Sequence, residues 1–180
     1  MSISAVPAAS VVLTDLSSVA RTGFKGADTP HWLVAQGLTI PDVPNRAVMQ
    51  ADGSLLARLS AGEFLLLGRP EGGAGLVETL DAAWSWEAGA GLCFPLPRRD
   101  SHAWFRLRGP AVPAMMAKLC GVDLRRHVFA DGAVAQTSVA RLNGIVIRQG
   151  EDFHLLADSA SAEYLRACVV DAMTEFVPAA

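Results

Sequence analysis

The stretches Arg21-Thr22-Gly23-Phe24-Lys25-Gly26 and Trp104-Phe105-Arg106-Leu107-Arg108-Gly109 begin two similar halves of this 180-residue chain. Each predicts a short strand that ends in a basic residue and a glycine, and the two final glycines lie 83 residues apart. A proline follows each glycine at the same offset, at Pro30 and Pro113. Proline is tolerated in the first turn of a helix because its missing N–H has no partner there. The pattern indicates an internal duplication.

Both predicted helices end at a glycine, Gly37 and Gly121, which we expect in left-handed C-terminal caps. The second helix also repeats apolar residues at helical spacing. Its predicted buried face consists of Val112, Met115, Met116 and Leu119. Methionine commonly fills gaps between a helix and a sheet, so this face indicates core packing rather than a cofactor site.

Two hairpins are expected after the helices, at Asp52-Gly53 and Asn143-Gly144, because these pairs favour the type I′ turn. The following strands are predicted at residues 64–67 and 153–157, each introduced by a second turn. Each half then ends in a helix, at residues 76–86 and 160–176. The buried stripe of the last helix is predicted to be Leu165, Val169, Ala172 and Phe176.

Each half therefore predicts a β-α-β-β-β-α unit, and the fold class is α+β with antiparallel sheets. Two such units packed about a pseudo-twofold axis would bury the faces that each exposes alone. The expected bounds are residues 13–88 for the first repeat and 102–177 for the second. Residues 89–101, with Gly91, Pro95 and Pro97, are the predicted connector.

Composition excludes several classes of protein. Fifteen Lys and Arg against 18 Asp and Glu give a net charge of -3, which does not favour nucleic acid as a partner. The apolar runs are far shorter than the ~20 residues that span a membrane, and residues 1–13 lack the basic start of a secretory signal. Cys93, Cys120 and Cys168 show no pairing pattern, so we expect buried, reduced thiols and a cytoplasmic protein.

Two basic clusters are the candidate binding residues: Arg98, Arg99 and His102, and Arg125, Arg126 and His127. They are open to two interpretations. In the first, each cluster binds a ligand: either an anion, such as the glutamate tail of a folate, or a partner subunit through salt bridges. The alternative is that both are solvated loops without a specific ligand.

Other chemistry is not indicated. A dinucleotide-binding Gly-x-Gly-x-x-Gly motif is missing, and Gly72-Gly73-Ala74-Gly75 is better explained as a flexible loop. Asp100, Ser101 and His102 are the residue types of a hydrolase triad, but sequence neighbours do not normally orient toward one reacting atom. His31 and His154 have no second histidine at ligand spacing, so we expect structural roles and no metal site.

The order and spacing of several stretches resemble the gamma, or small, subunit of heterotetrameric sarcosine oxidase. The matching stretches begin with Leu13-Thr14-Asp15-Leu16-Ser17 and continue at residues 23–26, 32–38, 44–45, 118–125, 134–140 and 157–165. They cover most of residues 13–176, although none is a sharp motif alone. The order of elements also resembles the duplicated fold of folate-binding aminomethyltransferases.

The resemblance implies a non-catalytic accessory subunit of a complex that oxidatively demethylates sarcosine to glycine. It also implies that FAD, FMN, NAD and tetrahydrofolate bind to larger partner subunits. Dimethylglycine or another N-methyl amine is an alternative substrate of the complex. A stand-alone folate-binding module and a homodimer are alternatives for the chain itself.

Trp84 and Trp86 lie two residues apart in the predicted helix at 76–86. Side chains two apart on a helix point to different faces, so both cannot enter one core. We therefore expect one of them at an interface, either between the repeats or with a partner.

Overall fold

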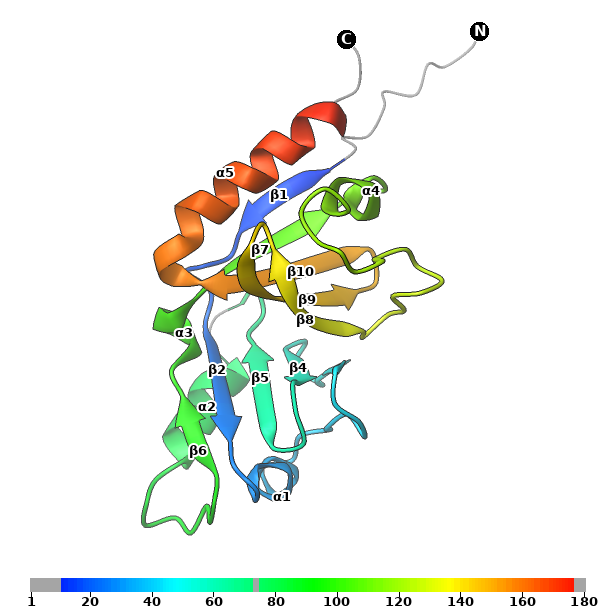
Figure 1. Cartoon of the computed structure of the whole chain (residues 1–180). Coiled ribbons are helices and arrows are strands. Elements are labelled where there is room, and N and C mark those ends of the chain that lie inside the picture. Colours follow the sequence, from blue (N-terminus) through cyan, green and yellow to red (C-terminus); the bar gives the residue numbers. More distant parts are fainter. Residues whose placement is uncertain (1–10, 73–74, 177–180) are drawn as a thin grey trace, which may run out of the picture.

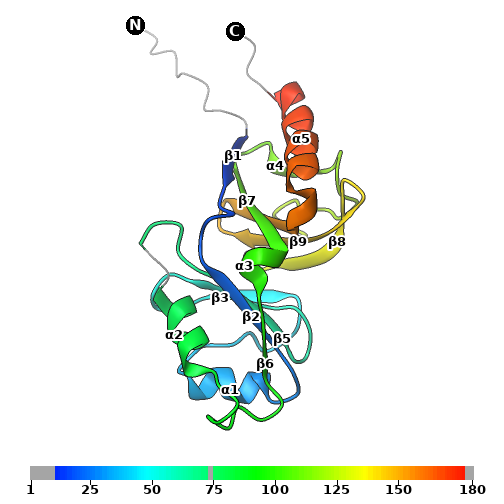
Figure 2. The same cartoon turned by 90° about the vertical axis from the view of Figure 1, so that its left-hand side faces the viewer.

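The computed structural model describes residues 11–72 and 75–176. Over these ranges the chain forms two five-stranded antiparallel sheets, with helices on the outer face of each (Figures 1 and 2). The layers run helix, sheet, sheet, helix, which buries both faces of each sheet. The predicted α+β class and duplicated antiparallel architecture are confirmed.

Sheet A, the upper sheet in Figure 1, has the order β1 (Val12–Asp15), β7 (His102–Arg108), β10 (Asp152–Asp158), β9 (Leu142–Gln149) and β8 (Val134–Val139). Sheet B has the order β3 (Arg46–Met49), β4 (Leu55–Arg58), β5 (Glu63–Leu67), β2 (Arg21–Lys25) and β6 (Phe94–Leu96). Helices α4 (Val112–Met116) and α5 (Ala162–Met173) cover sheet A, and α1 (Thr29–Ala35) and α2 (Gly75–Ala83) cover sheet B. Short helices α3 (Arg98–Ser101), η1 (Ser159–Ser161) and η2 (Thr174–Phe176) complete the order.

The two repeats exchange their first strands. Strand β1 lies at the start of the expected first repeat but pairs with β7 in sheet A. Strand β6 precedes the second repeat but pairs with β2 in sheet B. Residues 13–15 of the expected first repeat therefore lie in the sheet of the second, and the expected connector at 89–101 contains a strand of the first sheet. Residue 177, the expected end of the second repeat, lies outside the described residues.

Strand alternation divides the apolar residues among three layers. On β9, Ile145 and Ile147 face sheet B, while Val146 between them faces the helices of sheet A. Successive side chains of a strand point to opposite faces, and here both faces are buried. The layer between the sheets contains Leu16, Leu55, Ala57, Leu59, Leu65, Leu67, Trp104, Val134, Ile145, Ile147 and Leu156.

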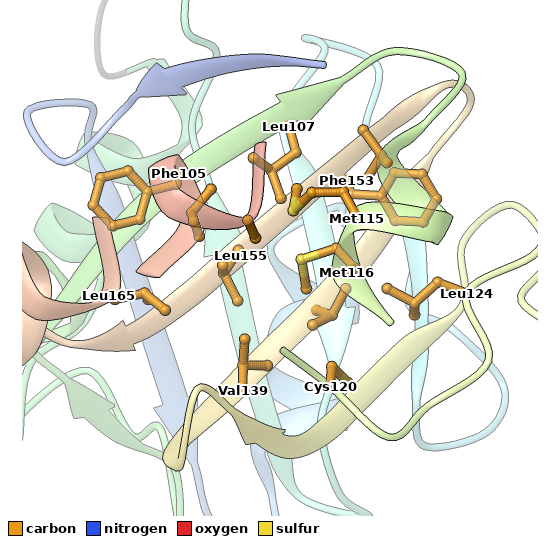
Figure 3. Close-up of a cluster of buried hydrophobic side chains, with 14 of the residues drawn as sticks. Phe105, Leu107, Met115, Met116, Cys120, Leu124, Val139, Phe153, Leu155 and Leu165 are labelled. Carbon is orange, nitrogen blue, oxygen red and sulfur yellow. The ribbon is translucent and has the colours of Figure 1, made fainter. Parts of the chain in front are cut away.

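The outer layer of sheet A explains the methionine-rich helix face. Met115 and Met116 are fully buried and pack with Phe153, Leu155 and Leu124 (Figure 3). The predicted stripe of α5 is also confirmed. Leu165, Val169 and Ala172 are buried in this cluster, and Phe176 packs against it.

The predicted cap of the first helix is confirmed at Gly37. This glycine has a φ of 84°, and its N–H donates to the carbonyl of Val34 at 2.9 Å. The N–H of Leu38 donates to the carbonyl of Leu33 at 3.1 Å, which completes a Schellman motif. Gly26 and Gly109, at equivalent strand-to-helix junctions, also have positive φ, at 146° and 136°.

Both hairpins form, but their predicted turn type or position is wrong. The first turn passes through Ala51 and Asp52 to a left-handed Gly53, so Asp52-Gly53 is not a type I′ pair. The second hairpin turns at Ala140-Arg141, whose φ values of 50° and 67° fit a type I′ turn. Asn143-Gly144 lies within β9 instead.

Tertiary contacts explain the position of the second turn. The N–H of Ala140 donates to the carbonyl of Leu119 at 2.8 Å, and the Tyr164 hydroxyl donates to the carbonyl of Ala140 at 3.1 Å. Val139 also bridges Cys120. These contacts outweigh the local preference of an Asn-Gly pair for the turn.

Two predicted helix ends are corrected as well. Gly121 does not have a positive φ, because α4 ends at Met116 and continues as tight turns into the bridge at Cys120. Helix α2 ends at Ala83, so Trp84 and Trp86 lie beyond it and the helical-face argument for them is wrong.

Candidate functional site

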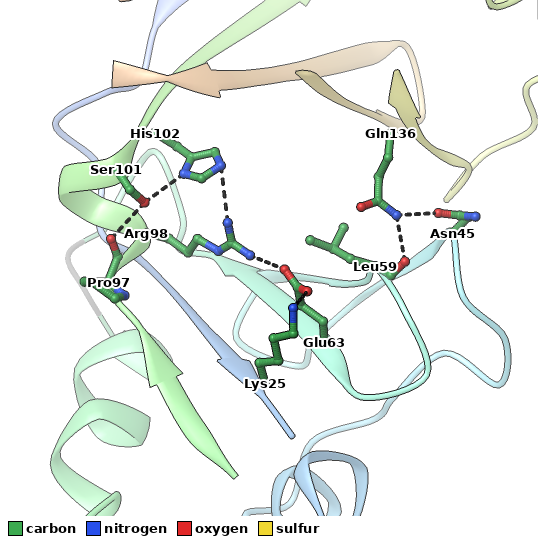
Figure 4. A network of polar contacts seen from close by, with 9 residues as sticks. All are labelled: Lys25, Asn45, Leu59, Glu63, Pro97, Arg98, Ser101, His102 and Gln136. Atoms are coloured by element: carbon green, nitrogen blue, oxygen red, sulfur yellow. Dashed lines mark hydrogen bonds and ion pairs between the residues drawn. The ribbon is translucent and has the colours of Figure 1, made fainter. Parts of the chain in front are cut away.

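The first basic cluster is held by internal ion pairs (Figure 4). The Arg98 guanidinium forms an ion pair with Glu63, and Lys25 Nζ lies 3.0 Å from the other carboxylate oxygen of Glu63. Burial alone would raise the pKa of Glu63, but the Lys25 hydrogen bond and the charge of Arg98 together lower it. The Arg98 side chain is 12% exposed. Its charge therefore already has a partner.

His102 is a neutral member of the same network. Arg98 Nη1 lies 3.3 Å from His102 Nε2, which must accept because guanidinium has no acceptor. Ser101 Oγ donates to the carbonyl of Pro97 at 3.0 Å, so His102 Nδ1 donates to Ser101 Oγ at 2.8 Å. Burial, followed by the charges of Arg98 and Arg21, lowers the pKa of His102.

Ser101 and His102 thus touch, although they are sequence neighbours. The contact has the wrong polarity for a hydrolase, because His102 donates to the hydroxyl rather than accepting its proton. Arg98, and not Asp100, orients the second ring nitrogen. The hydrogen-bond directions around His102 are therefore those of a structural contact and not of a catalytic triad. The sequence alone does not give these directions.

Arg21 joins the two crossover segments between the sheets. This residue is 3% exposed, and its guanidinium donates to the carbonyls of Ser17 and Val19 at 3.0 and 2.8 Å. It also donates to the carbonyls of Arg99 at 2.8 Å and of His102. Burial lowers the pKa of Arg21, with a further contribution from Arg99. The backbone around the first cluster is therefore part of the fold, while the Arg99 side chain is exposed.

The second basic cluster lies in the loop between α4 and β8. Arg125 pairs with Asp123 at 2.6 Å, and Arg126 pairs with Glu151 at 2.5 Å. The hydrogen bonds from Arg125 lower the pKa of Asp123 to about 2. His127 is exposed beside them.

The structure does not bring the two clusters together. His102 begins β7, whereas Gly109, just after this strand, lines the same cavity as Arg125 and Arg126. Seven residues of strand at about 3.3 Å each separate the clusters by roughly 20 Å. They are two distinct surfaces rather than one anion site.

The cavity beside the second cluster has a volume of about 850 Å³. Its lining includes Arg148, which is 4% exposed. The sequence analysis missed this residue. The signal was present in the alternation of β9, because Arg148 lies two residues after Val146 and shares its outer face.

A second cavity, of about 540 Å³, lies between the sheets and is lined by Trp104 and His154. The Trp104 indole N–H donates to His154 Nδ1 at 3.1 Å, so His154 Nε2 carries the proton and donates to Gln149 Oε1 at 2.8 Å. Burial lowers the pKa of His154 to about 4. His154 is thus a satisfied internal histidine, and His31 is exposed.

Apolar side chains are exposed on the loop that leads into β6. Trp86 is 73% exposed, Leu92 57% and Phe94 38%. The Trp86 ring lies 5.1 Å from that of Trp84 and 5.8 Å from that of Phe94, measured between centroids. Trp84 itself packs on the core of sheet B and donates to the carbonyl of Cys93 at 2.7 Å. Trp86, Leu92 and Phe94 form what we call the aromatic patch.

Two further features concern residues 11–72 and 75–176, the part of the chain that the structure describes. None of the helices there has the length and apolar character to cross a bilayer. Nor do three or more His, Cys, Asp or Glu side chains converge there in a possible metal site. The predicted loop at 72–75 falls partly outside the described residues, at 73–74.

Comparison with curated proteins shows similarity over most of the chain. The chain is 28% identical over 174 residues to a sarcosine oxidase subunit gamma of Arthrobacter sp., covering 94% of this chain and 83% of the relative. It is 29% identical over 143 residues to a subunit of the same name from Corynebacterium sp. strain P-1, covering 79% of this chain and 68% of the relative. No family model matches the chain.

Solved structures agree in fold. Heterotetrameric sarcosine oxidase from Corynebacterium sp. U-96, in complex with pyrrole 2-carboxylate, contains a chain that matches with a TM-score of 0.80 and 23% identity, over 97% of this chain and 90% of that one. Aminomethyltransferase T of the glycine cleavage system from Bartonella henselae matches with a TM-score of 0.62 and 19% identity, over 90% of this chain and 46% of that one. The resemblances expected from the sequence are confirmed.

Proposed function

We infer that this chain is a gamma-type accessory subunit of a sarcosine oxidase complex that oxidatively demethylates sarcosine to glycine. One observation carries this inference: the similarity to sarcosine oxidase gamma subunits extends over 94% of the chain and 83% of the relative. The side chains support an accessory role. The Ser101 and His102 pair has the polarity of a structural contact, and Arg98 is neutralised by Glu63.

We propose that the cofactors of the complex, FAD, FMN, NAD and tetrahydrofolate, bind to the larger partner subunits. The support is the resemblance, together with a sequence that lacks the glycine motif of dinucleotide-binding loops. We also propose a cytoplasmic location. The support is that all three cysteines are free thiols, and Cys93 and Cys120 are buried. Free thiols are typical of proteins in a reducing compartment.

We propose that the aromatic patch contacts a larger subunit. Its three members are exposed in the chain alone, and Trp86 is the most exposed of them. The neighbouring strand β6 is an edge strand of sheet B. Aromatic side chains are enriched at protein interfaces because they bury large areas with little loss of conformational freedom.

Co-expression with the candidate larger subunits tests the assignment as a subunit and the role of the aromatic patch. An affinity tag on this chain should recover the other subunits in stoichiometric amounts, and Trp86→Ser should reduce their recovery. Val170→Ser is the matched control, because Val170 is 43% exposed on α5 at the opposite end of the molecule (Figure 1). Recovery of the tagged chain alone, as a monodisperse monomer, would contradict the assignment as a subunit. Equal recovery with both variants would contradict only the role of the aromatic patch.

A further inference from the structure

Arg148 is a buried cation without a buried anion. The residue is 4% exposed on the outer face of sheet A. Its Nε donates to the carbonyl of Gly150 at 2.9 Å and its Nη1 to the carbonyl of Phe129 at 3.0 Å. Its guanidinium carbon lies 5.3 Å from the centroid of the Phe153 ring. These partners are neutral, and in the described part of the chain no carboxylate forms an ion pair with Arg148.

A buried charge with only neutral partners is costly unless an opposite charge completes its environment. The other charged side chains on the cavity wall already pair among themselves, Arg125 with Asp123 and Arg126 with Glu151. Three guanidinium groups and two carboxylates therefore line the cavity, and the one positive charge left over is that of Arg148.

The rest of the wall is apolar. Pro110, Pro113, Ala114 and Ala117 line the helical side, and Leu124 and Phe153 also contribute. The volume of about 850 Å³ is within the range of small-molecule sites. An apolar wall with one uncompensated guanidinium suits a ligand that has an apolar body and a single negative charge.

We propose that this cavity binds a small organic carboxylate, with its carboxylate on Arg148 and its apolar body against α4. Within residues 11–72 and 75–176, Nε and Nη1 of Arg148 have hydrogen-bond partners and Nη2 has none, which leaves Nη2 to donate to the ligand. The site lies on the helix-covered face of sheet A and not between the sheets. It gives this subunit a ligand of its own, beyond its role in assembly.

Arg148 has a competing role as a purely structural residue, because its Nη1 bond to the carbonyl of Phe129 holds that loop to the sheet and its Nε bond holds the turn at Gly150. The two roles predict different results for the same probe. If Arg148 is only structural, the chain should bind an anion and a neutral molecule of the same shape equally tightly. A carboxylate site should prefer benzoate to benzamide.

Titration of the purified full chain with benzoate and benzamide, followed by amide chemical shifts, is the test. Benzoate should bind at least about tenfold more tightly than benzamide, because hydrogen bonds to an ionised group are stronger than neutral ones. Arg148→Gln should abolish that preference, whereas Arg166→Gln, an exposed arginine on α5, should leave it intact. Equal binding of the two probes by the parent chain would overturn the proposal.

A second variant decides the question even if Arg148→Gln fails to fold. Ala117 is exposed on the cavity wall, so Ala117→Phe should occupy the space against α4 while keeping the Arg148 side chain, and it should weaken benzoate binding at least about tenfold. Unchanged binding by this variant would place benzoate elsewhere and refute the site.

Repeating the titration on the co-purified complex separates two sources of carboxylate. Retained binding supports a small-molecule ligand, and lost binding overturns it in favour of an acidic side chain of the partner.

Discussion

Acidification should destabilise this protein through His154, which lies between the two sheets. Its Nδ1 accepts the Trp104 indole hydrogen bond, and its Nε2 donates to Gln149. Protonation of Nδ1 would place a second hydrogen opposite the indole N–H and bring a charge into a site that is 3% exposed. Burial, the main cause, and the charge of Arg106 both lower the pKa, while Asp152 opposes them. The pKa falls from 6.5 to about 4.

The direction of the effect follows from that lowered pKa. Above pH 6.5 the histidine is neutral in both the folded and the unfolded chain, so it contributes no pH dependence. As the pH falls from 6.5 toward 4, the unfolded chain gains the proton first and folding stability is lost. Below pH 4 both states are protonated and the loss levels off. Between pH 7.5 and pH 5 the expected loss is about 2 kcal/mol.

Urea unfolding followed by tryptophan fluorescence at pH 7.5 and pH 5 measures this loss. Other groups also titrate, so the comparison is made with His154→Gln, which should lose about 2 kcal/mol less than the parent on acidification. His127→Gln, an exposed histidine, is the control and should behave like the parent. If His154→Gln and the parent lose equal stability between the two pH values, the buried neutral histidine does not have the lowered pKa described here.

Three further predictions concern the fold and the absence of cofactors. Gly26→Val and Gly109→Val should each destabilise by about 1–3 kcal/mol or more, because both glycines have positive φ and a Cβ at Gly26 would lie 1.8 Å from the Leu92 carbonyl oxygen. Gly121→Ala, with open space around it, should change stability by less than about 0.5 kcal/mol. If Gly26→Val and Gly109→Val both melt like the parent, the repeat alignment is wrong at these glycines. Arg21→Met should cost about 2–4 kcal/mol, since it leaves four carbonyls without their donor, while the exposed Arg99→Met should be nearly neutral in the same thermal melts. The purified chain should show no flavin absorbance after desalting, and flavin bands near stoichiometry would contradict the placement of the flavins in other subunits.

The candidate site shows how far single residues can be interpreted from sequence. Arg98 and Arg125 were noticed because they stand in basic clusters, yet both have carboxylate partners, and Glu63, the partner of Arg98, lies 35 residues away. Arg148 was missed because one charge in an apolar strand looks like a surface residue. Its burial depends on the loop and helix that cover that face, and these come from other parts of the chain.

The sequence by itself determined the repeated order of elements, the buried stripe of α5 and the left-handed cap at Gly37. These features are local: they depend on the spacing of apolar residues along one element and on the freedom of glycine to adopt positive φ. Only the tertiary structure decided where the second hairpin turns, because contacts from Leu119 and Tyr164 hold Ala140 in the turn against the preference of Asn143-Gly144. It also decided that β1 and β6 exchange sheets. An edge strand is placed by backbone hydrogen bonds to a distant partner, and all residues except proline offer the same donor and acceptor, so its own side chains do not specify which sheet it joins.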